Sequence, residues 1–386
     1  MSTTYAILGA GMQGTSAAYD LAKYADAASI IFGDADLAQA SRAAARVDGL
    51  AGRSVCSARQ VNALEPAELT GFLEPADVVL SCVPYWMHPH VAPAAIASKT
   101  HMVDMGGNTS VTRQTLRLDP DARKAGVTLV PDTGLAPGLV NNLGSYLIER
   151  LDTVESIKLY CGGLPQHPKP PFNYKLVFNI EGLLTEYNDE AEMLRNGAIT
   201  SVPTLEELEA LEIEGLGSME AFTTSGGTST APETWQGCVK NYEYKTIRYP
   251  GHCALMKVFK DYGFWGRSPI DVKSGKATPR DVFEALMGPA LKDPTDRDLV
   301  VVRAIGVGMS NGAPSRHQID ILQRHDEATG FTAMEQLTGM STAIYAAAIA
   351  AGGMEPGCLR YETALTGHRF MDEMRRRPVS LTVHPA

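Results

Sequence analysis

The sequence predicts an α/β protein of two domains, and three observations lead to this class. Short apolar segments alternate with helix-length segments from Tyr5 to about residue 131, which is typical of βαβ units and a parallel sheet. After Pro137 and Gly138 the pattern changes to longer strands of alternating or aromatic character, which indicates a mainly antiparallel or mixed second sheet. With 386 residues the chain is long enough for two domains with separate cores.

The first element is an apolar strand that runs into three glycines and then into an alanine-rich helix. Gly9, Gly11 and Gly14 fit the order strand, G-x-G-x-x-G, helix of a Rossmann dinucleotide-binding domain. In that turn the first glycine makes the bend, the second admits the pyrophosphate and the third lets the helix pack on the strand. Met12 and Gln13 lie inside the turn and are expected to contact the cofactor as well. A glycine-rich turn of an ordinary α/β domain is the alternative.

The second strand ends in an acidic residue that bears on the choice of cofactor. Asp34 follows an apolar run and lies twenty residues beyond Gly14. A carboxylate at this place hydrogen-bonds the adenosine ribose hydroxyls and repels a 2′-phosphate, so NAD is predicted rather than NADP. Asp36 either caps the next helix or shares the ribose, and the capping preference of Asp favours the cap.

The other strand ends of the parallel sheet predict further cofactor contacts. Ligands of such sheets bind beyond the carboxyl ends of the strands. From the residues at these ends we assign to the cofactor Cys82, Val83 and Pro84 after one strand, and Asp104 and Gly106 after the next. The last strand of the alternating region ends at Asp132, Thr133 and Gly134.

Composition and charge exclude several classes of partner. A net charge of −10 without a basic run argues against nucleic acid and against an anionic membrane surface. No apolar stretch reaches spanning length and no signal-peptide pattern is present, so a cytoplasmic protein is expected. Six scattered cysteines without C-x-x-C indicate neither disulfides nor zinc. The pair His88 and His90 lacks a third ligand at metal-binding spacing, so no metal is expected.

The same patterns set the expected domain boundaries. Residues 1–136 form the dinucleotide-binding domain and residues 137–325 form the second domain. The segment 332–354 is too apolar and alanine-rich to stand alone in water. Residues 326–386 are therefore expected to be a helical segment that returns to pack on the first domain.

Six short sequence motifs are spread over most of the chain. They are ILGAGMQG at 7–14, VDMGGN at 103–108, PDTGLAPGLVNNL at 131–143, LYCGGLP at 159–165, KTIRYPGH at 245–252 and MEQLTGMSTAIYAA at 334–347. Together they resemble the saccharopine dehydrogenase family, and within it most closely the bacterial L-lysine 6-dehydrogenases. The resemblance implies an NAD(P)-dependent enzyme that acts on a carbon–nitrogen bond of an amino acid. It also implies an inserted domain that binds substrate and supports dimerisation, so a homodimer or higher homo-oligomer is expected.

Two candidate catalytic residues come from this resemblance. Asp132 matches the DxG…PG motif of the family and would exchange a proton with the substrate amine. Its alternative is a turn or helix cap, because Asp is a common turn former. Cys161 matches a cysteine that lines the site in similar saccharopine reductases, and a small buried thiol is its alternative.

Substrate binding is expected from a second group of residues. Arg248 has the family position in KTIRYPGH and would hold a substrate carboxylate with its planar fork, unless it forms a surface ion pair. Tyr174 and Lys175 are its expected neighbours on a strand at 174–187, and His252 is a further candidate.

The chain departs from the family pattern in one feature of the expected cofactor site. Saccharopine reductases often keep basic residues after the second strand, where this chain has Asp34.

The reaction expected from the resemblance is the NAD-dependent oxidative deamination of the ε-amino group of L-lysine. Its products are ammonia and the 6-semialdehyde, which cyclises to piperideine-6-carboxylate. The stretch 165–235 is rich in Glu and poor in basic residues, which suits a dibasic substrate better than saccharopine with its additional carboxylates. A saccharopine dehydrogenase acting on a secondary amine and a catalytically silent NAD-binding sensor are the alternatives.

Overall fold

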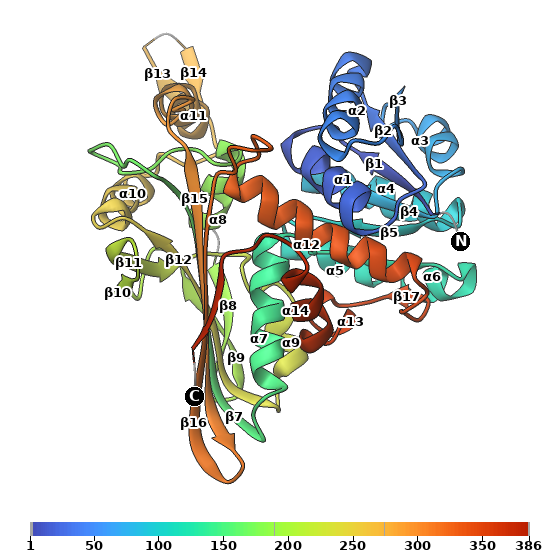
Figure 1. Ribbon diagram of the computed structural model, residues 1–386. Coiled ribbons are helices and arrows are strands. Elements are labelled where there is room, and N and C mark those ends of the chain that lie inside the picture. The colour runs from blue at the N-terminus through green and yellow to red at the C-terminus, as the bar shows by residue number, and fades with distance from the viewer. Residues whose placement is uncertain (1–2, 189, 274, 385–386) are drawn as a thin grey trace.

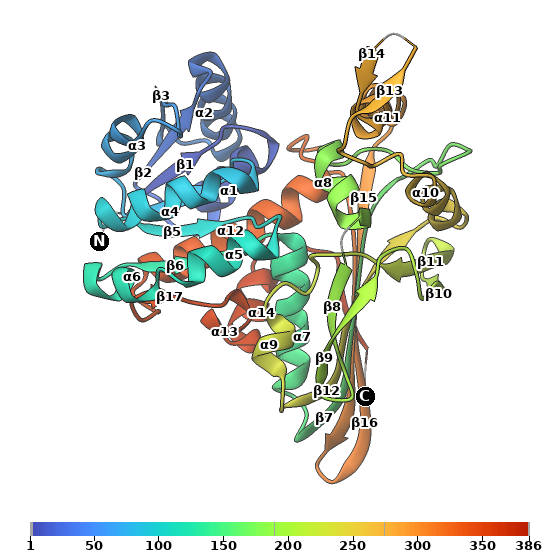
Figure 2. The same cartoon turned by 180° about the vertical axis from the view of Figure 1, so that it is seen from behind.

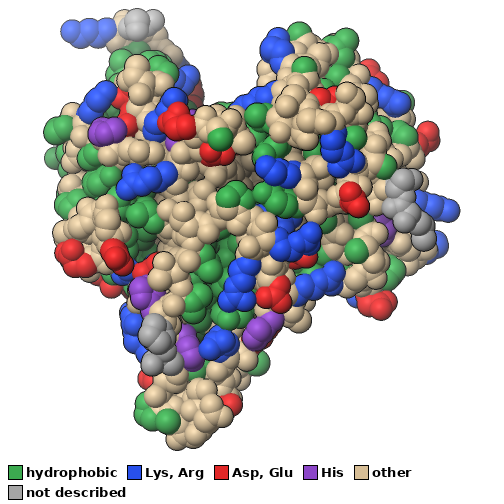
Figure 3. Space-filling model, viewed as in Figure 1, with side chains coloured by type: hydrophobic (Ala, Val, Ile, Leu, Met, Phe, Trp, Pro, Cys, Tyr) green, Lys and Arg blue, Asp and Glu red, His purple; other side chains and the backbone are tan. Residues whose placement is uncertain are grey.

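The protein has two lobes, each built around its own β-sheet (Figures 1 and 2). The structure is a computed structural model that describes residues 3–188, 190–273 and 275–384. In the space-filling view a notch at the top of one face separates the lobes (Figure 3). Among the described residues, no helix has the length and apolar character needed to cross a membrane.

The first lobe contains a parallel sheet, with seven strands in the described part of the chain. In spatial order they are β17 (Gly357–Cys358), β6 (Thr128–Val130), β5 (His101–Asp104), β4 (Val78–Ser81), β1 (Thr4–Leu8), β2 (Ser29–Asp34) and β3 (Cys56–Gln60). Every residue of β4 is buried, because helices cover both faces of the sheet. The strand order reverses at β1, so the carboxyl ends of β1 and β4 flank the crevice where ligands of this fold bind. The predicted α/β class with a parallel N-terminal sheet is confirmed.

Helices pack on both faces of this sheet. They are α1 (Met12–Tyr24), α2 (Leu37–Ala51), α3 (Pro66–Leu73), η1 (Tyr85–Met87), α4 (His88–Ala97), α5 (Thr109–Leu116) and α6 (Asp119–Ala125). Apolar side chains of α1 and α2 belong to one core cluster, and those of α3, α4 and α6 belong to another. Asp36 caps α2 by accepting a hydrogen bond from Ala38 N at 2.8 Å, which is the role that its sequence position favoured.

The second lobe contains a mixed sheet, with nine strands among the described residues. They are β7 (Thr153–Pro165), β8 (Glu190–Arg195), β9 (Ala198–Pro203), β10 (Glu209–Ile213), β11 (Gly217–Thr223), β12 (Val239–Arg248), β15 (Asp298–Ser310), β16 (Ala313–Arg324) and β18 (Leu381–His384). Strand β12 is parallel to β7, whereas β15 and β16 are antiparallel neighbours on the other side. Helix α7 (Val140–Ile148) lies against this sheet, and Gly306 in β15 leaves room for Leu147.

The segment 174–187 differs from the predicted strand. Its second half forms α8 (Ile180–Asn188), which buries Leu183, Leu184 and Tyr187. These apolar side chains and Ile180 recur with the spacing of one helical face, so a helix buries them together where a strand would divide them between two faces. Helices α10 (His252–Asp261) and α11 (Pro279–Ala290) pack against α8. The hairpin of β13 (Ile270–Val272) and β14 (Gly275–Ala277) projects from this lobe beside α11 (Figure 1).

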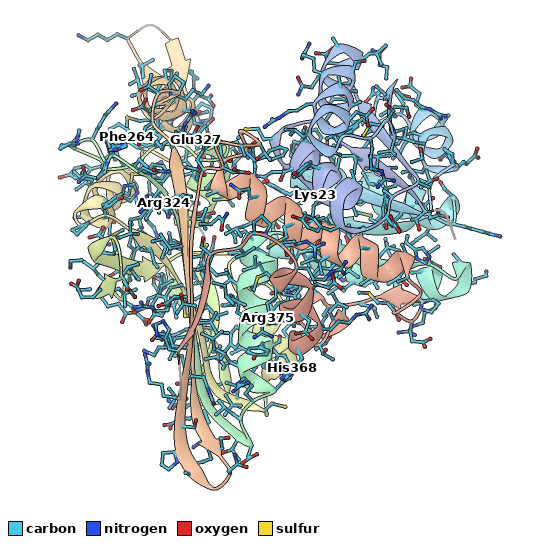
Figure 4. All side chains as sticks on the ribbon, viewed as in Figure 1. Lys23, Phe264, Arg324, Glu327, His368 and Arg375 are labelled. Carbon is cyan, nitrogen blue, oxygen red and sulfur yellow. The ribbon has the colours of Figure 1, made fainter. Side chains whose placement is uncertain are left out.

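The C-terminal tail connects both lobes. Helix α12 (Ala333–Ala350) packs against α1, and a Cβ on its Gly339 would lie 2.6 Å from Ala17 N. Strand β17 then joins the parallel sheet, α13 (Tyr361–Ala364) and α14 (Gly367–Arg375) follow, and β18 pairs with β16. His368 of α14, labelled in Figure 4, lies beside α7, with its Nδ1 2.5 Å from Glu149. The tail thus contains α12, α13 and α14 and supplies one strand to each sheet.

Candidate functional site

A cavity of about 890 Å³ lies between the two lobes. The first lobe lines it with strand ends and the beginnings of helices, and the second lobe with α8, β8 and the segment that joins β11 to α9 (Ala231–Trp235). Of the site residues predicted from sequence, those that line the cavity are Gln13, Cys82, Val83, Pro84, Gly106 and Asp132.

The glycine turn has the geometry of a pyrophosphate site. A Cβ on Gly9 would lie 2.7 Å from Cys82 O, and a Cβ on Gly14 would lie 2.2 Å from Gly9 O, so both positions require glycine. Gly11 differs, because a Cβ there would meet no atom within 4 Å. It begins α1 and leaves open space beside the helix N-terminus, where unpaired N–H groups favour phosphate. Met12 next to it is 51 % exposed.

Asp34 lies at the carboxyl end of β2 and contacts the same turn. Its Oδ2 accepts from Ala10 N at 2.9 Å, and its Oδ1 accepts from Asp36 N at 3.0 Å. Gln39 also reaches the turn, donating from Nε2 to Ala10 O at 2.8 Å. The carboxylate therefore orders the glycine turn in addition to standing where an adenosine ribose is expected.

A buried carboxylate organises the ends of β5 and β6. Asp104 Oδ1 accepts hydrogen bonds from Gly106 N at 2.8 Å and from Asp132 N at 2.9 Å. His88 lies beneath it, with Nε2 4.0 Å from Asp104 and Nδ1 3.0 Å from Ser81 Oγ. His88 thus begins α4 as a buried residue. Asp104 does not line the cavity, and it acts on the site through the two backbone groups that it holds.

Asp132 is the most unusual residue of the site. It has a left-handed φ of +63°, it is fully buried, and its Oδ2 accepts a hydrogen bond from Ser229 Oγ. Oδ1 has no hydrogen-bond partner among the described residues. Burial, and then the charge of Asp104, raise the pKa of Asp132 to about 7, against the hydroxyl of Ser229, which lowers it. A carboxyl group that exchanges its proton near neutral pH is suited to acid–base chemistry.

A second carboxyl group of the cavity lies on α8. Glu186 is 33 % exposed, toward the cavity that it lines, and its Oε2 is 3.9 Å from Arg248 Nη2. Burial raises the pKa of Glu186 to about 7, although the nearby Arg248 lowers it. Arg248 lies behind this carboxyl group and is itself buried, with Nε donating to Tyr187 Oη at 3.0 Å and Nη1 to Ile247 O at 2.9 Å.

The remaining predicted site residues of the second lobe surround Arg248 or lie farther away. The ring of Tyr174 is 4.9 Å from the Arg248 guanidinium and 5.1 Å from the ring of His252. Burial, followed by the charge of Arg248, lowers the pKa of His252 to about 3, so this side chain stays neutral. Lys175 donates instead to the backbone carbonyls of Asp293 and Asp296, at 2.9 and 2.6 Å. None of these four side chains is among the described residues that line the cavity.

Cys161 lies inside the second sheet, in the middle of β7. It is 5 % exposed and does not line the cavity. Burial raises the pKa of its thiol to about 12. The structure therefore places Cys161 as a buried neutral thiol, which is the alternative that its sequence position left open.

Sequence reasoning missed several residues of the second-lobe wall. Glu186 lies in a segment that was read as a strand, so nothing placed it toward a ligand. Ser229 belongs to the polar string TSGGTS at 224–229, which follows β11 and lines the cavity. Two adjacent glycines among hydroxyl residues at a strand end are the sequence signal that could have identified this loop.

Arg113 on α5 was also missed, because its partners are far away in sequence. It pairs with Glu192 and, at 2.7 Å, with Glu233, and so joins the first lobe to β8 and α9. Arg360 reaches Glu233 from the other side at 2.6 Å. No cluster of three or more His, Cys, Asp or Glu side chains in the described part of the chain could hold a metal ion.

Two domain families together match nearly all of the chain. Residues 5–130 match the saccharopine dehydrogenase NADP binding domain, and residues 134–379 match the saccharopine dehydrogenase C-terminal domain. The first match identifies the glycine turn as part of a nicotinamide-nucleotide-binding domain, which agrees with its geometry. The boundary between the two matches falls beside Asp132, in the cavity wall.

Two relatives are similar in sequence to parts of this chain. Mitochondrial alpha-aminoadipic semialdehyde synthase of Mus musculus is 29 % identical over 233 residues, which are 56 % of this chain and 24 % of that protein. Saccharopine dehydrogenase (NADP+, L-glutamate-forming) of Saccharomyces cerevisiae is 31 % identical over 178 residues, or 44 % of this chain and 39 % of that protein. The matches thus span about a quarter of the first relative and two fifths of the second.

A solved structure shares the complete architecture. The apo saccharopine dehydrogenase (L-Glu forming) from Saccharomyces cerevisiae superposes with a TM-score of 0.80 at 19 % identity, and the match covers 100 % of both chains. At this identity the likeness concerns the fold, which supports the two-lobe arrangement. The resemblance predicted from the six sequence strings is confirmed by the family matches: the chain belongs to the saccharopine dehydrogenase family.

Proposed function

We propose that the protein catalyses the NAD-dependent oxidative deamination of the ε-amino group of L-lysine. The observation that carries this proposal is the acidic wall of the cavity, which contains Glu181, Glu186, Glu190 and Glu192. Arg113 is the one basic side chain among the described residues that line the cavity, and it is already paired with two glutamates. Carboxylates in excess attract a substrate with two ammonium groups and repel one with several carboxylates.

Asp132 is placed to handle the proton of the reaction. The substrate amine must be neutral before hydride leaves its carbon, because an ammonium nitrogen has no lone pair to stabilise the iminium product. Asp132 lines the cavity, its Oδ1 has no partner among the described residues, and its pKa is about 7. As a carboxylate it therefore takes the proton of the bound ammonium and releases it to water near neutral pH.

Arg248 and Glu186 suit the carboxylate of the amino acid in a pH-dependent way. Arg248 lies behind Glu186, so a substrate carboxylate reaches the guanidinium only when Glu186 is neutral or turned aside. A pKa of about 7 makes the neutral form of Glu186 accessible. The two groups then present one positive charge and one hydroxyl donor to the substrate.

The first lobe supplies the cofactor site. When bound, nicotinamide provides the hydride acceptor. Gly11 and the N-terminus of α1 would hold the pyrophosphate, Asp34 the ribose, and Cys82, Val83 and Pro84 the end that enters the cavity. We propose NAD over NADP because Asp34 would repel a 2′-phosphate. L-lysine, NAD and water then give the semialdehyde, ammonium, NADH and one proton.

A second candidate is the oxidation of the secondary amine of saccharopine. The similarity of this chain to a glutamate-forming saccharopine dehydrogenase favours this candidate. In this chain the additional carboxylates of such a substrate would have to meet the acidic wall or displace Glu192 from Arg113.

The test compares the two substrates directly. We expect NADH formation with L-lysine, with ammonia released in equal amount, at a specificity constant at least tenfold above that for saccharopine. A higher specificity constant for saccharopine would favour the second candidate. Absence of NADH and NADPH formation with either substrate would contradict both.

A further inference from the structure

The hydrogen bond to Asp132 crosses from one lobe to the other. Asp132 follows β6 of the first lobe, whereas Ser229 belongs to the segment between β11 and α9 of the second. Ser229 is 2 % exposed, and its hydroxyl donates to Oδ2. On the opposite side, Gly106 leaves room for the carboxylate, because a Cβ there would lie 2.3 Å from Oδ1. The hydrogen bond to Oδ2 of Asp132 therefore comes from the other lobe.

The second lobe holds Ser229 in an uncommon conformation. Its φ is +42°, which is rare for a residue other than glycine, and its N–H donates to Gly226 O at 3.0 Å. The preceding residue, Thr228, donates from Oγ1 to Glu192 O at 2.7 Å and accepts at its carbonyl from Tyr361 Oη at 2.9 Å. Strained conformations persist where the surroundings determine them, and they concentrate at functional sites.

We propose that Ser229 is a positioning residue that orients the carboxylate of Asp132 and completes the proton acceptor across the cavity. This inference rests on the proposed function, in which Asp132 accepts the substrate proton. Asp132 would receive the hydrogen bond of Ser229 only when the two lobes are as close as in this structure. The ion pairs of Arg113 with Glu192 and Glu233 join the lobes beside the same segment and would favour that arrangement.

The charges around Asp132 explain why one hydroxyl matters. Asp104 faces it from β5 and Glu362 from α13, and both raise the pKa of Asp132. Tyr361 of α13 is buried beside it, and His88 of α4 lies behind Asp104. Against burial and these charges, the hydroxyls of Ser229 and Thr112 favour the ionised form. Loss of the Ser229 hydroxyl should therefore make Asp132 harder to ionise.

The first experiment is the pH profile of kcat/KM for L-lysine. For the wild-type protein we expect kcat/KM to rise with pH through about 7, the pKa of Asp132. In Ser229→Ala the rising limb should move up by about one pH unit, which means about tenfold lower kcat/KM at pH 6 and a much smaller loss at pH 9. Ser229→Gly should give the same shift, because glycine tolerates the positive φ and removes the same hydroxyl.

Thr234→Val is the matched control. Thr234 donates a similar hydroxyl hydrogen bond to a buried carboxylate, at 2.6 Å to Glu362, but it does not contact Asp132 or line the cavity. Its loss should lower stability and leave the rising limb within about 0.3 pH units of wild type. A limb that stays in place in both Ser229 variants, or that moves equally in Thr234→Val, would overturn the proposal.

A second measurement does not depend on turnover. The raised pKa means that Asp132 contributes stability at low pH that is lost as pH rises through about 7. In Ser229→Ala this loss should continue to about pH 8, so the melting temperature should fall further than in wild type between pH 7 and pH 9. Adding Asp132→Asn should abolish the extra fall, because the titrating group is gone.

The two measurements separate the failure of this inference from the failure of the proposed function. If L-lysine gives no NADH but the melting curves show the extra fall and its removal by Asp132→Asn, the positioning of Asp132 stands and the reaction is wrong. If wild type oxidises L-lysine while neither the pH profile nor the melting curves respond to loss of the hydroxyl, the reaction stands and the role of Ser229 is wrong.

Discussion

The two walls of the cavity are made of different parts of the polypeptide. The first lobe presents backbone groups at strand ends and glycines: Gly106 lines the cavity, and the turn of Gly9 and Gly11 adjoins it at Cys82. The second-lobe wall is made of side chains, with glutamates on α8 and β8 and hydroxyl residues between β11 and α9. Each wall suits one of the two expected ligands. Fixed backbone groups suit the phosphates of the cofactor, which never vary, whereas charged side chains distinguish one substrate from another.

The difference also separates rigid positions from adjustable ones. At Gly9 and Gly14 an added methyl group would collide with the backbone, so these positions tolerate no change. At Glu186 the carboxyl group is partly exposed, so we expect its replacement to leave the fold intact. Substitutions in the glycine turn of the first lobe should therefore reduce cofactor affinity or stability. Substitutions in the second-lobe wall should instead reduce the discrimination between substrates.

Asp132 is an acidic side chain on the first-lobe wall, and its replacement should have the largest effect. Asp132→Asn keeps the shape and a hydrogen-bond acceptor for Ser229 but cannot exchange the proton, so we expect kcat/KM to fall by about 100-fold or more. NAD affinity, measured by quenching of protein fluorescence, should change little. Because Asp132 is ionised and buried above pH 7, the Asn variant should exceed the melting temperature of wild type at pH 8.5 by a larger margin than at pH 5.

Two glycines of the same turn provide a sharp test of the backbone wall. A Cβ at Gly11 meets nothing in the protein, so Gly11→Ala should keep the melting temperature and lose NAD affinity by about tenfold or more through collision with the pyrophosphate. Gly14→Ala, with its Cβ 2.2 Å from Gly9 O, should instead unfold at a lower temperature. Equal NAD affinity of Gly11→Ala and wild type would place the cofactor elsewhere.

How far the sequence could predict each wall follows from the same contrast. The backbone wall was predictable, because Gly9, Gly11, Gly14 and the strand ends act through local geometry that a short string specifies. The second-lobe wall was not, because whether Glu186 reaches the cavity depends on how α8 packs on residues far away in sequence.

Buried polar groups were predictable in identity but not in environment. The string KTIRYPGH singled out Arg248, yet only the fold shows that its donors already bind Tyr187 and the Ile247 carbonyl. Likewise the resemblance singled out Cys161, while the place of this residue inside β7 is a property of the sheet register. Side-chain roles of this kind depend on tertiary contacts that no short sequence pattern contains.

The adjustable wall should respond to a charge change with an intermediate effect. Glu186→Gln fixes the neutral state that a substrate carboxylate needs beside Arg248, so we expect the KM for L-lysine at pH 8 to fall by about tenfold while the KM for NAD stays unchanged. Glu155→Gln, which removes a carboxylate that does not line the cavity, is the control and should leave both constants as they are. An unchanged KM for L-lysine in Glu186→Gln would remove this carboxyl group from substrate recognition.

The smallest effect is expected for the acidic residue beside the glycine turn, Asp34. Its carboxylate has two tasks, because it holds Ala10 N and Asp36 N and would also repel a 2′-phosphate. Asp34→Asn keeps an acceptor for the turn but loses the charge, so NAD affinity should fall by less than threefold while the preference for NAD over NADP narrows by about tenfold. Asp34→Ala loses both tasks and should also lower the melting temperature. An unchanged ratio of the two cofactor affinities in Asp34→Asn would mean that discrimination comes from shape alone.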